Sequence, residues 1–196
     1  AGRREPGRRS NEIEKNVELT RSFYLGEQEI SNRSFKQFDP GHDSGLLGRA
    51  LLSEEDRPVV NVSWEEAVRF SNWLSEKDGL PAAYELKDGQ WRLRSPTTIG
   101  YRLPTEAEWA WAARYASGKL PTRFPWGDNM PPTAGSGNYA DVSAANMVPY
   151  SIKGYNDNFR GPAPSGTYAP NELGIFDLAG NVSEWINDYY SVELHR

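Results

Sequence analysis

The sequence predicts a loop-rich α+β domain, and three observations support this prediction. Aromatic residues are abundant, with 7 Trp, 10 Tyr and 7 Phe, although only 37% of all residues are hydrophobic. Glycine and proline are also frequent, at 18 and 14 residues. Two stretches with helical spacing are followed by a long segment without helical or strand periodicity. Aromatic side chains bury a large area and several carry a polar group, so they can form a core among irregular loops.

The length and the net charge of the chain limit how many domains it can form and which kinds of partner it can bind. With 196 residues, the chain is long enough for one domain or two small ones. Its 22 Lys and Arg residues against 27 Asp and Glu residues give a net charge of −5, so there is no overall positive field to attract nucleic acid. We therefore expect no nucleic-acid partner. No apolar run approaches the roughly 18 residues of a membrane helix, which predicts no membrane span.

The chain contains no cysteine, which excludes disulfides, thiolate metal sites and a cysteine nucleophile within these residues. Only two histidines are present, His42 and His195, which are too few for a metal centre with three imidazole ligands. A site that holds a cation through oxygen ligands remains possible.

Residues 1–16 form a charged segment with an excess of arginine and no periodicity. This composition predicts a solvated arm, and the alternative is a peptide that docks on another surface. The folded domain is therefore expected within residues 17–196.

Regular structure is expected to begin directly after this arm. Apolar and polar residues alternate over 17–25, which is the pattern of a half-buried strand. Ser31 is then expected to begin a short helix that carries Phe35 and Phe38. Residues 40–56 contain three glycines and are expected to form a loop.

Two further helices are predicted from their N-terminal caps. Ser63 and Glu66 match a capping box, in which each side chain bonds the other residue's backbone N–H, and helical spacing continues up to Gly79. Thr105 and Glu108 form a second capping box, which is followed by an apolar stripe. This stripe stops before Gly118 and consists of Trp109, Ala112, Ala113 and Ala116.

A β-hairpin is expected between these two helices. Residues 84–86 and 91–93 are strand-like, and Asp88-Gly89 lies between them. An Asp-Gly pair is a strong signal for a two-residue hairpin turn.

Residues 118–174 are expected to form one long loop. This segment contains 8 Gly and 8 Pro in 57 positions. Its many aromatic residues argue against disorder, because a solvated linker would not carry them. Because no disulfide can stabilise such a loop, we expect a bound cation to stabilise it.

Five sequence blocks together resemble the formylglycine-generating enzyme family, also called sulfatase-modifying factors. The blocks are FYLGEQEISN (23–32), PVVNVSW (58–64), YRLPTEAEW (101–109), FPWG (124–127) and GNVSEW (180–185). The resemblance implies a compact, loop-rich variant of the C-type lectin fold with little regular secondary structure. It covers roughly residues 17–190.

The resemblance also implies two calcium ions in the loop-rich part of the chain. One site would use the side chains of Asp141 and Asp157 with the carbonyls of Val142 and Phe159. The other would use the side chains of Asp177 and Glu184 with the carbonyls of Gly180 and Val182. Carboxylates and carbonyls spread over a loop suit the flexible coordination of calcium. The alternative is that Asp157 forms a turn and Glu184 is a solvent-facing carboxylate on a strand.

Family members that oxidise a substrate cysteine to formylglycine use two cysteines, separated by four residues, which bind copper(I) downstream of the GNVSEW block. These 196 residues contain neither cysteine, and Ser71 stands where many relatives carry another one. We expect the remainder of the domain to lie C-terminal to Arg196, where it would pair with a strand at 185–190.

Two functional hypotheses therefore stand. In the first, the chain is a calcium-stabilised, non-catalytic module that binds a protein or peptide partner in a periplasmic, cell-surface or extracellular setting. In the second, it is the larger part of a copper- and oxygen-dependent oxidase that converts a peptide cysteine to formylglycine, with its catalytic cysteines beyond Arg196. Sugar binding through calcium is an analogy drawn from the lectin-like fold.

Three asparagines, Asn32, Asn61 and Asn181, match the glycosylation pattern Asn-x-Ser/Thr. Two of them lie in blocks expected to be structural, so the matches do not predict glycosylation.

Overall fold

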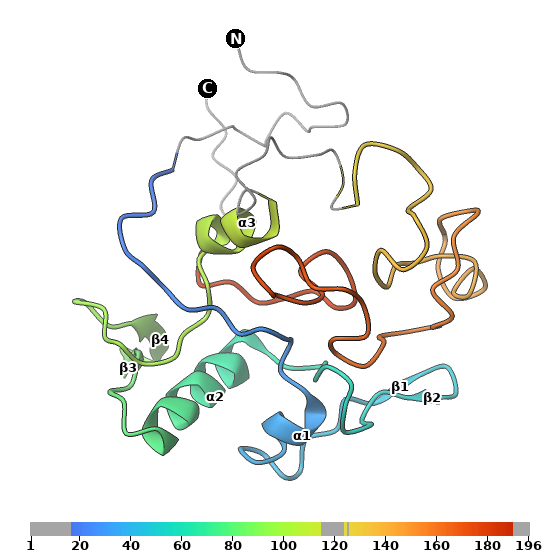
Figure 1. Ribbon diagram of the computed structural model, residues 1–196. Helices are drawn as coiled ribbons and strands as arrows, with labels where there is room; N and C mark the ends of the chain where they lie inside the picture. The colour runs from blue at the N-terminus through green and yellow to red at the C-terminus, as the bar shows by residue number, and fades with distance from the viewer. Residues whose placement is uncertain (1–16, 115–123, 125, 190–196) are drawn as a thin grey trace, which may run out of the picture.

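All helices and strands of the described residues lie in the first part of the chain. The computed structural model describes residues 17–114, 124 and 126–189. Its elements are α1 (Asn32–Phe35), β1 (Leu46–Leu47), β2 (Ala50–Leu51), α2 (Trp64–Lys77), β3 (Tyr84–Lys87), β4 (Gln90–Leu93) and α3 (Glu106–Arg114) (Figure 1). Residues 126–189 form only turns, bends and isolated bridges. The loop-rich α+β prediction is therefore confirmed. No described helix has the length and apolar character that a membrane crossing requires.

Both predicted capping boxes form. The Ser63 side chain accepts a bond from the Glu66 N–H (3.2 Å), while Glu66 Oε2 accepts one from the Ser63 N–H (2.7 Å). At α3, Thr105 and Glu108 exchange the same pair of bonds, at 3.2 and 2.8 Å. Each pair satisfies N–H groups that the first helical turn leaves without an internal partner. The predicted C-terminal end of α3, before Gly118, lies outside the described residues.

The predicted hairpin is confirmed with its turn. β3 and β4 pair antiparallel, with Lys87 opposite Gln90. Asp88 and Gly89 both have positive φ, at 53° and 74°, as a two-residue turn matching the strand twist requires. The loop predicted over 40–56 is partly wrong, because β1 and β2 form a short ribbon within it. Each of these strands is only two residues long, too short for a periodic signal.

The strand predicted over 17–25 is wrong. Its alternation holds only in part, since Phe23 and Leu25 are half-buried and Tyr24 is fully exposed, whereas Val17 and Arg21 are also exposed. However, the inward side chains contact α3 rather than a neighbouring strand. Phe23 packs edge to face on Trp111, with ring centroids 5.9 Å apart. The strand predicted at 185–190 is also not observed over 185–189, and residue 190 lies outside the described residues.

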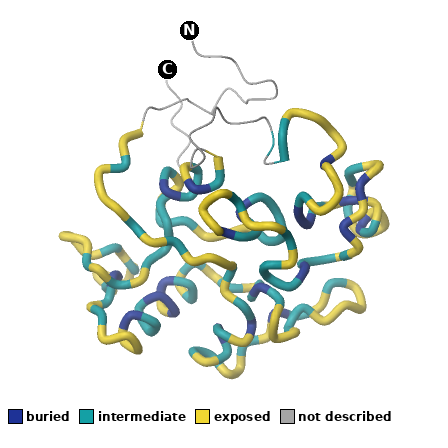
Figure 2. The backbone as a smooth tube through the Cα atoms, in the orientation of Figure 1, coloured by how far each residue is buried: buried dark blue, intermediate teal, exposed yellow. Residues whose placement is uncertain are grey.

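The core has two main clusters. In the first, Val68 of α2 packs against Ala83 and Tyr84 of the hairpin. In the second, Ala112 of α3 packs against Ile175 and Leu178, so the last loop segment lies against α3 (Figures 1 and 2).

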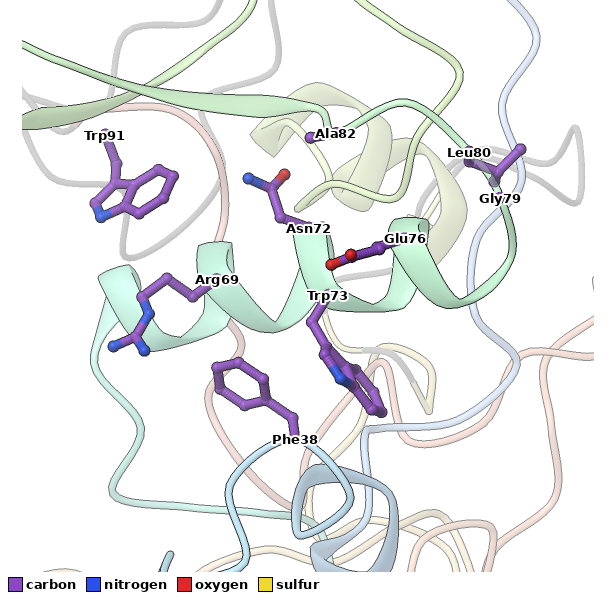
Figure 3. Close-up of a pocket in the computed structure, with 9 residues that line it drawn as sticks. All are labelled: Phe38, Arg69, Asn72, Trp73, Glu76, Gly79, Leu80, Ala82 and Trp91. Carbon is purple, nitrogen blue, oxygen red and sulfur yellow. The ribbon is translucent and has the colours of Figure 1, made fainter.

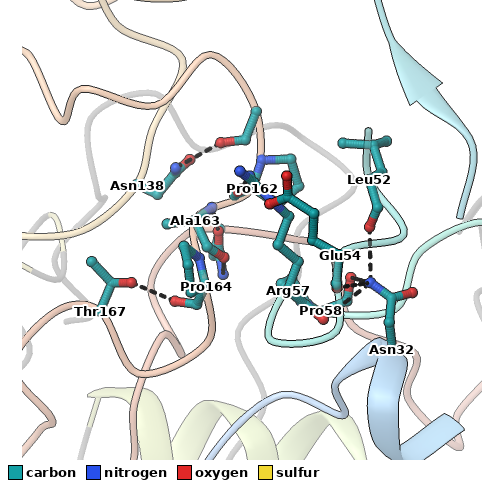
Figure 4. A network of polar contacts seen from close by, with 12 residues as sticks. Asn32, Leu52, Glu54, Arg57, Pro58, Asn138, Pro162, Ala163, Pro164 and Thr167 are labelled. Atoms are coloured by element: carbon teal, nitrogen blue, oxygen red, sulfur yellow. Dashed lines mark hydrogen bonds and ion pairs between the residues drawn. The ribbon is translucent and has the colours of Figure 1, made fainter. Parts of the chain in front are cut away.

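A polar network also joins the two parts of the chain (Figure 4). Asn32 is fully buried, and its amide group donates to the carbonyls of Leu52 and Glu54 at 2.8 and 2.9 Å. Arg57 then donates to the carbonyl of Pro162 in the loop-rich part. The Asn32 amide is therefore not accessible for glycosylation, and the pattern match at this position is structural.

Candidate functional site

The first predicted group of calcium ligands comes together around a buried carboxylate. Asp141 is fully buried and accepts bonds from the Ser143 N–H (2.7 Å), the Ser143 hydroxyl (2.6 Å) and the Asp157 N–H. Asp157, also buried, accepts bonds from the N–H groups of Tyr139 and Phe159, both at 2.8 Å. These bonds tie together two segments that are about 16 residues apart in the chain.

The electrostatics of the two aspartates differ. Burial alone would raise the pKa of Asp141, but hydrogen bonds from Ser143 and from the Asp157 amide outweigh burial and lower that pKa. Burial raises the pKa of Asp157, and the charge of Asp141 adds to this increase. At neutral pH, Asp141 is therefore an ionised acceptor at the centre of the group.

The Ser143 hydroxyl lies between two of the predicted ligand oxygens. It donates toward Asp141 Oδ1 and also contacts the Phe159 carbonyl. Val142 is exposed, and its N–H reaches the Tyr155 carbonyl only at 3.5 Å. The structure thus brings the Asp141, Asp157 and Phe159 oxygens to one place. Asp157 also bonds the amide two residues ahead, so the turn-forming alternative describes part of its role.

The second predicted group surrounds Asp177. This residue has a left-handed backbone (φ 57°), its side chain accepts the Gly166 N–H at 2.7 Å, and its carbonyl accepts the Gly180 N–H at 3.1 Å. Glu184 Oε2 accepts the Trp109 indole N–H at 2.5 Å. Surrounding protein raises the pKa of Glu184, although the residue as a whole is exposed. Glu184 lies on no strand, so the strand part of the alternative is wrong.

Glu29, which no sequence pattern marked as a site residue, lies within this second group. Glu29 Oε2 accepts a bond from Asn181 Nδ2 (2.7 Å), and Oε1 accepts one from the Val182 N–H (3.3 Å). Burial raises the pKa of Glu29 to about 8, and the charges of Asp177 and Glu184 contribute to this increase. The available signal was an acidic residue inside the FYLGEQEISN block, but its partners lie about 150 residues away.

This second group carries more negative charge than the described residues around it compensate. The ion pairs found among the described residues join Arg33 to Glu55, Arg57 to Glu54 and Arg102 to Glu108, and none includes Glu29, Asp177 or Glu184. Partly buried carboxylates without a cation are costly and shift toward the protonated form. A divalent cation would remove this cost.

The donor chemistry fits calcium better than it fits a metal held by acidic side chains alone. No three His, Asp or Glu side chains within residues 17–114 and 126–189 are close enough together to enclose a metal ion. Each predicted ligand set, however, has only two acidic side chains and takes its remaining oxygens from backbone carbonyls. Calcium accepts such mixed oxygen ligands, and in the first set the structure brings the Asp141, Asp157 and Phe159 oxygens close together.

The fold and this site define a loop-rich α+β domain whose second part is organised by acidic and amide side chains. The chain belongs to the sulfatase-modifying factor family, because the model of the sulfatase-modifying factor enzyme 1-like domain matches residues 1–195.

Individual relatives include both enzymes and proteins of other kinds. The chain is 32% identical over 148 residues to the formylglycine-generating enzyme of Thermomonospora curvata, covering 76% of this chain and 39% of that protein. It is 28% identical over 198 residues to the chaperone protein LppX of Paenibacillus barcinonensis, covering 93% and 68%. It is also 30% identical over 144 residues to the inactive Cα-formylglycine-generating enzyme 2 of Bos taurus, covering 73% and 36%.

Among solved structures, that of CarF is similar, with a TM-score of 0.55 and 27% identity over 85% of this chain and 68% of CarF. The resemblance to the formylglycine-generating enzyme family is confirmed by these findings. The chain spans about two fifths of the Thermomonospora enzyme, so the activity of that whole protein does not transfer to it directly.

Proposed function

We propose that this chain is a calcium-stabilised domain of the sulfatase-modifying factor family that binds or assembles with a protein or peptide partner. The observation that carries this proposal is the group of Glu29, Asp177 and Glu184. Burial, with a smaller contribution from the neighbouring carboxylates, raises the pKa of Glu29 and Glu184, and no ion pair among the described residues neutralises the group. A bound cation would stabilise this group together with the surrounding loops.

Two ions are proposed, and the residues that would hold them are those of the two ligand sets. Asp141, Val142, Asp157 and Phe159 form one set, and Asp177, Gly180, Val182 and Glu184 form the other. In the first set, the Ser143 hydroxyl would turn away from the Phe159 carbonyl or itself join the ligands. Calcium would neutralise these carboxylates and hold together loops that no described helix or strand stabilises.

A periplasmic, cell-surface or extracellular location fits these sites. Extracellular calcium-binding modules work with dissociation constants of about 10⁻⁴–10⁻³ M, which loop ligands of modest charge can provide. The inactive bovine protein and the Paenibacillus chaperone support a binding role, because this family includes proteins that are not described as active enzymes. The relation to C-type lectins remains a prediction from the family resemblance.

The second candidate function is formylglycine formation by a longer protein. The similarity to the Thermomonospora enzyme favours it. In that case, two cysteines separated by four residues would lie C-terminal to Arg196 and bind copper. Peptide mapping of the natural protein beyond Arg196 distinguishes the two functions, because a cysteine-free continuation would leave no copper ligands of this kind.

Thermal unfolding with calcium and after chelation tests the calcium proposal. Calcium at about 100 times its dissociation constant stabilises the folded state by about 2.7 kcal/mol for each occupied site. In a chain of this size, each kcal/mol corresponds to a Tm change of about 2–4 °C, so chelation should lower Tm by about 5–10 °C for each site that calcium occupies.

Each of the nearly isosteric variants Asp157→Asn and Glu184→Gln should lose the contribution of its own site, about half of the total difference, and the double variant should lose most of it. Glu55→Gln, which changes an exposed carboxylate paired with Arg33, should retain it. An unchanged melting curve after chelation would contradict the calcium proposal.

A further inference from the structure

An apolar groove opens along α2, away from the candidate calcium sites. The hairpin β3–β4 covers one side of α2, and the groove between them has a volume of about 710 Å³ (Figure 3). Trp91 of β4 forms one wall, and Trp73 of α2 and Phe38 form the other. Arg69 and Glu76 line the same groove along α2.

The walls of the groove are held in place by the surrounding structure. Trp73 packs on Phe70 and Phe38, with ring centroids 5.6 and 5.9 Å apart. The ammonium group of Lys77 lies 4.6 Å from the Trp73 ring centroid. The position of the Trp73 side chain is therefore fixed by contacts on several sides.

The hairpin is anchored to α2 beside the groove. Asn72 Nδ2 donates to the Tyr84 carbonyl at 2.9 Å, and the Tyr84 N–H donates to Asn72 Oδ1 at 3.0 Å. The Asn72 side chain thus bonds both backbone groups of Tyr84, as the backbone of a neighbouring strand would. Preformed walls lower the entropic cost of binding a ligand.

The apolar face of the hairpin continues beyond the core. Tyr84 is opposite Leu93 in the register and is buried, whereas Leu86 is opposite Trp91 and is 61% exposed. Side chains two residues apart on a strand share one face, so these four lie on the face that packs toward α2. Leu86 and Trp91 extend this apolar face past the part that α2 covers.

The charges along the groove indicate what it can bind. Arg69 and Glu76 are both exposed, and neither belongs to an ion pair with another described residue, although the Arg69 guanidinium lies 5.7 Å from the Phe38 ring centroid. Seven helical residues separate them by about 10.5 Å along the axis. In Figure 3, the guanidinium of Arg69 points away from Glu76, which lengthens the distance between the two charges.

An extended peptide matches this arrangement. Its side chains at positions i, i+2 and i+4 face one way and span about 13.6 Å, at about 3.4 Å per residue. An acidic residue at one end would meet Arg69, a basic residue at the other end would meet Glu76, and an apolar residue between them would lie between Trp73 and Trp91. Aromatic and arginine side chains at such positions contribute most of the binding energy in protein interfaces.

We propose that this groove binds an extended segment of a partner protein with the pattern acid–x–apolar–x–base, in either chain direction. The inference deepens the proposed binding function by naming the surface and the partner's chemistry. It does not depend on calcium, because the groove shares no residue with the two ligand sets.

The test uses the full chain and two synthetic peptides, Gly-Asp-Ser-Leu-Ser-Lys-Gly and the same peptide with Lys in place of Asp. Titration of the ¹⁵N-labelled protein with the first peptide should shift the indole N–H signals of Trp73 and Trp91. These shifts are detectable with about 1 mM peptide even if the Kd is near 1 mM, because about half of the protein is then bound. Trp73→Ala should weaken binding of the first peptide at least about tenfold.

Arg69→Glu provides the sharper comparison. This variant should prefer the Lys-containing peptide over the Asp-containing one by about tenfold or more, reversing the preference of the unchanged chain. Arg92→Glu is the control, because Arg92 is exposed on β4 on the face opposite Trp91.

Absence of indole shifts, or an unchanged peptide preference in Arg69→Glu, would overturn the proposal. So would indole shifts with a neutral oligosaccharide in place of the peptides, or occupation of the groove by a second copy of the chain in sedimentation experiments. The calcium-dependent Tm of each variant is measured in parallel, so failure of the groove and failure of the calcium sites remain separate results.

Discussion

The two parts of this chain are stabilised in different ways. In residues 17–114, order comes from capped helices, a hairpin and stacked aromatic rings. In residues 126–189, it comes from carboxylate and amide side chains that accept several backbone N–H groups. This difference shows that a carboxylate can hold a loop in place by accepting several backbone N–H groups, which in a sheet would bond the carbonyls of a neighbouring strand. We therefore expect the stability of the loop-rich part to depend on pH and on cations.

The largest effect is expected in the first part of the chain. Phe35 is 2% exposed and packs against the rings of Phe38, His42 and Phe70. Phe35→Ala leaves a cavity and should lower the free energy of unfolding by about 4 kcal/mol, measured by urea denaturation. Because this cluster contains none of the proposed ligands, the loss should be equal with and without calcium. A loss that disappeared in either condition would contradict the division into two parts.

A somewhat smaller effect is expected at the centre of the loop-rich part. Asp141→Ala removes the acceptor of three hydrogen bonds and leaves the buried Asp157 N–H and the partly buried Ser143 N–H without this partner. At about 1–3 kcal/mol for a buried unsatisfied group, the free energy of unfolding should fall by about 3 kcal/mol. Asp43 is the matched control, because its exposed carboxylate also accepts an N–H two residues ahead and a serine hydroxyl. If Asp43→Ala were equally destabilising, burial would not be the cause.

A third expected effect is a pH dependence of the metal-free chain. The folded-state pKa of Glu29, about 8, is above its ordinary value of 4.5, so between these values the folded state binds more protons than the unfolded state. Stability due to Glu29 is therefore full below pH 4.5 and is lost as the pH rises to 8. Glu29→Gln should flatten the pH profile of the unfolding free energy in this window. An identical profile in both proteins would show that Glu29 is not the titrating group.

Sequence reasoning succeeded where the signal is local. The boxes at Ser63 and Thr105 and the turn at Asp88-Gly89 need only neighbouring residues, and all three form. Alternation over 17–25 predicted that the side chains of Phe23 and Leu25 point inward, but it could not show that their neighbour is a helix. For the same reason Glu29 was missed, because its partner Asn181 is distant in the chain. The ligand sets remain predictions, although Asp141 and Asp157 do meet.

Hydrogen–deuterium exchange of the full chain, in calcium-saturated buffer and after chelation, tests the central claim most directly. The amides of Ser143, Asp157, Gly166 and Val182 donate to the carboxylates described above. Chelation should increase their exchange while amides within α2 keep their protection, because local opening does not require global unfolding. Equal changes in α2 and in these four amides, or no change in either, would contradict a loop-rich part held by calcium.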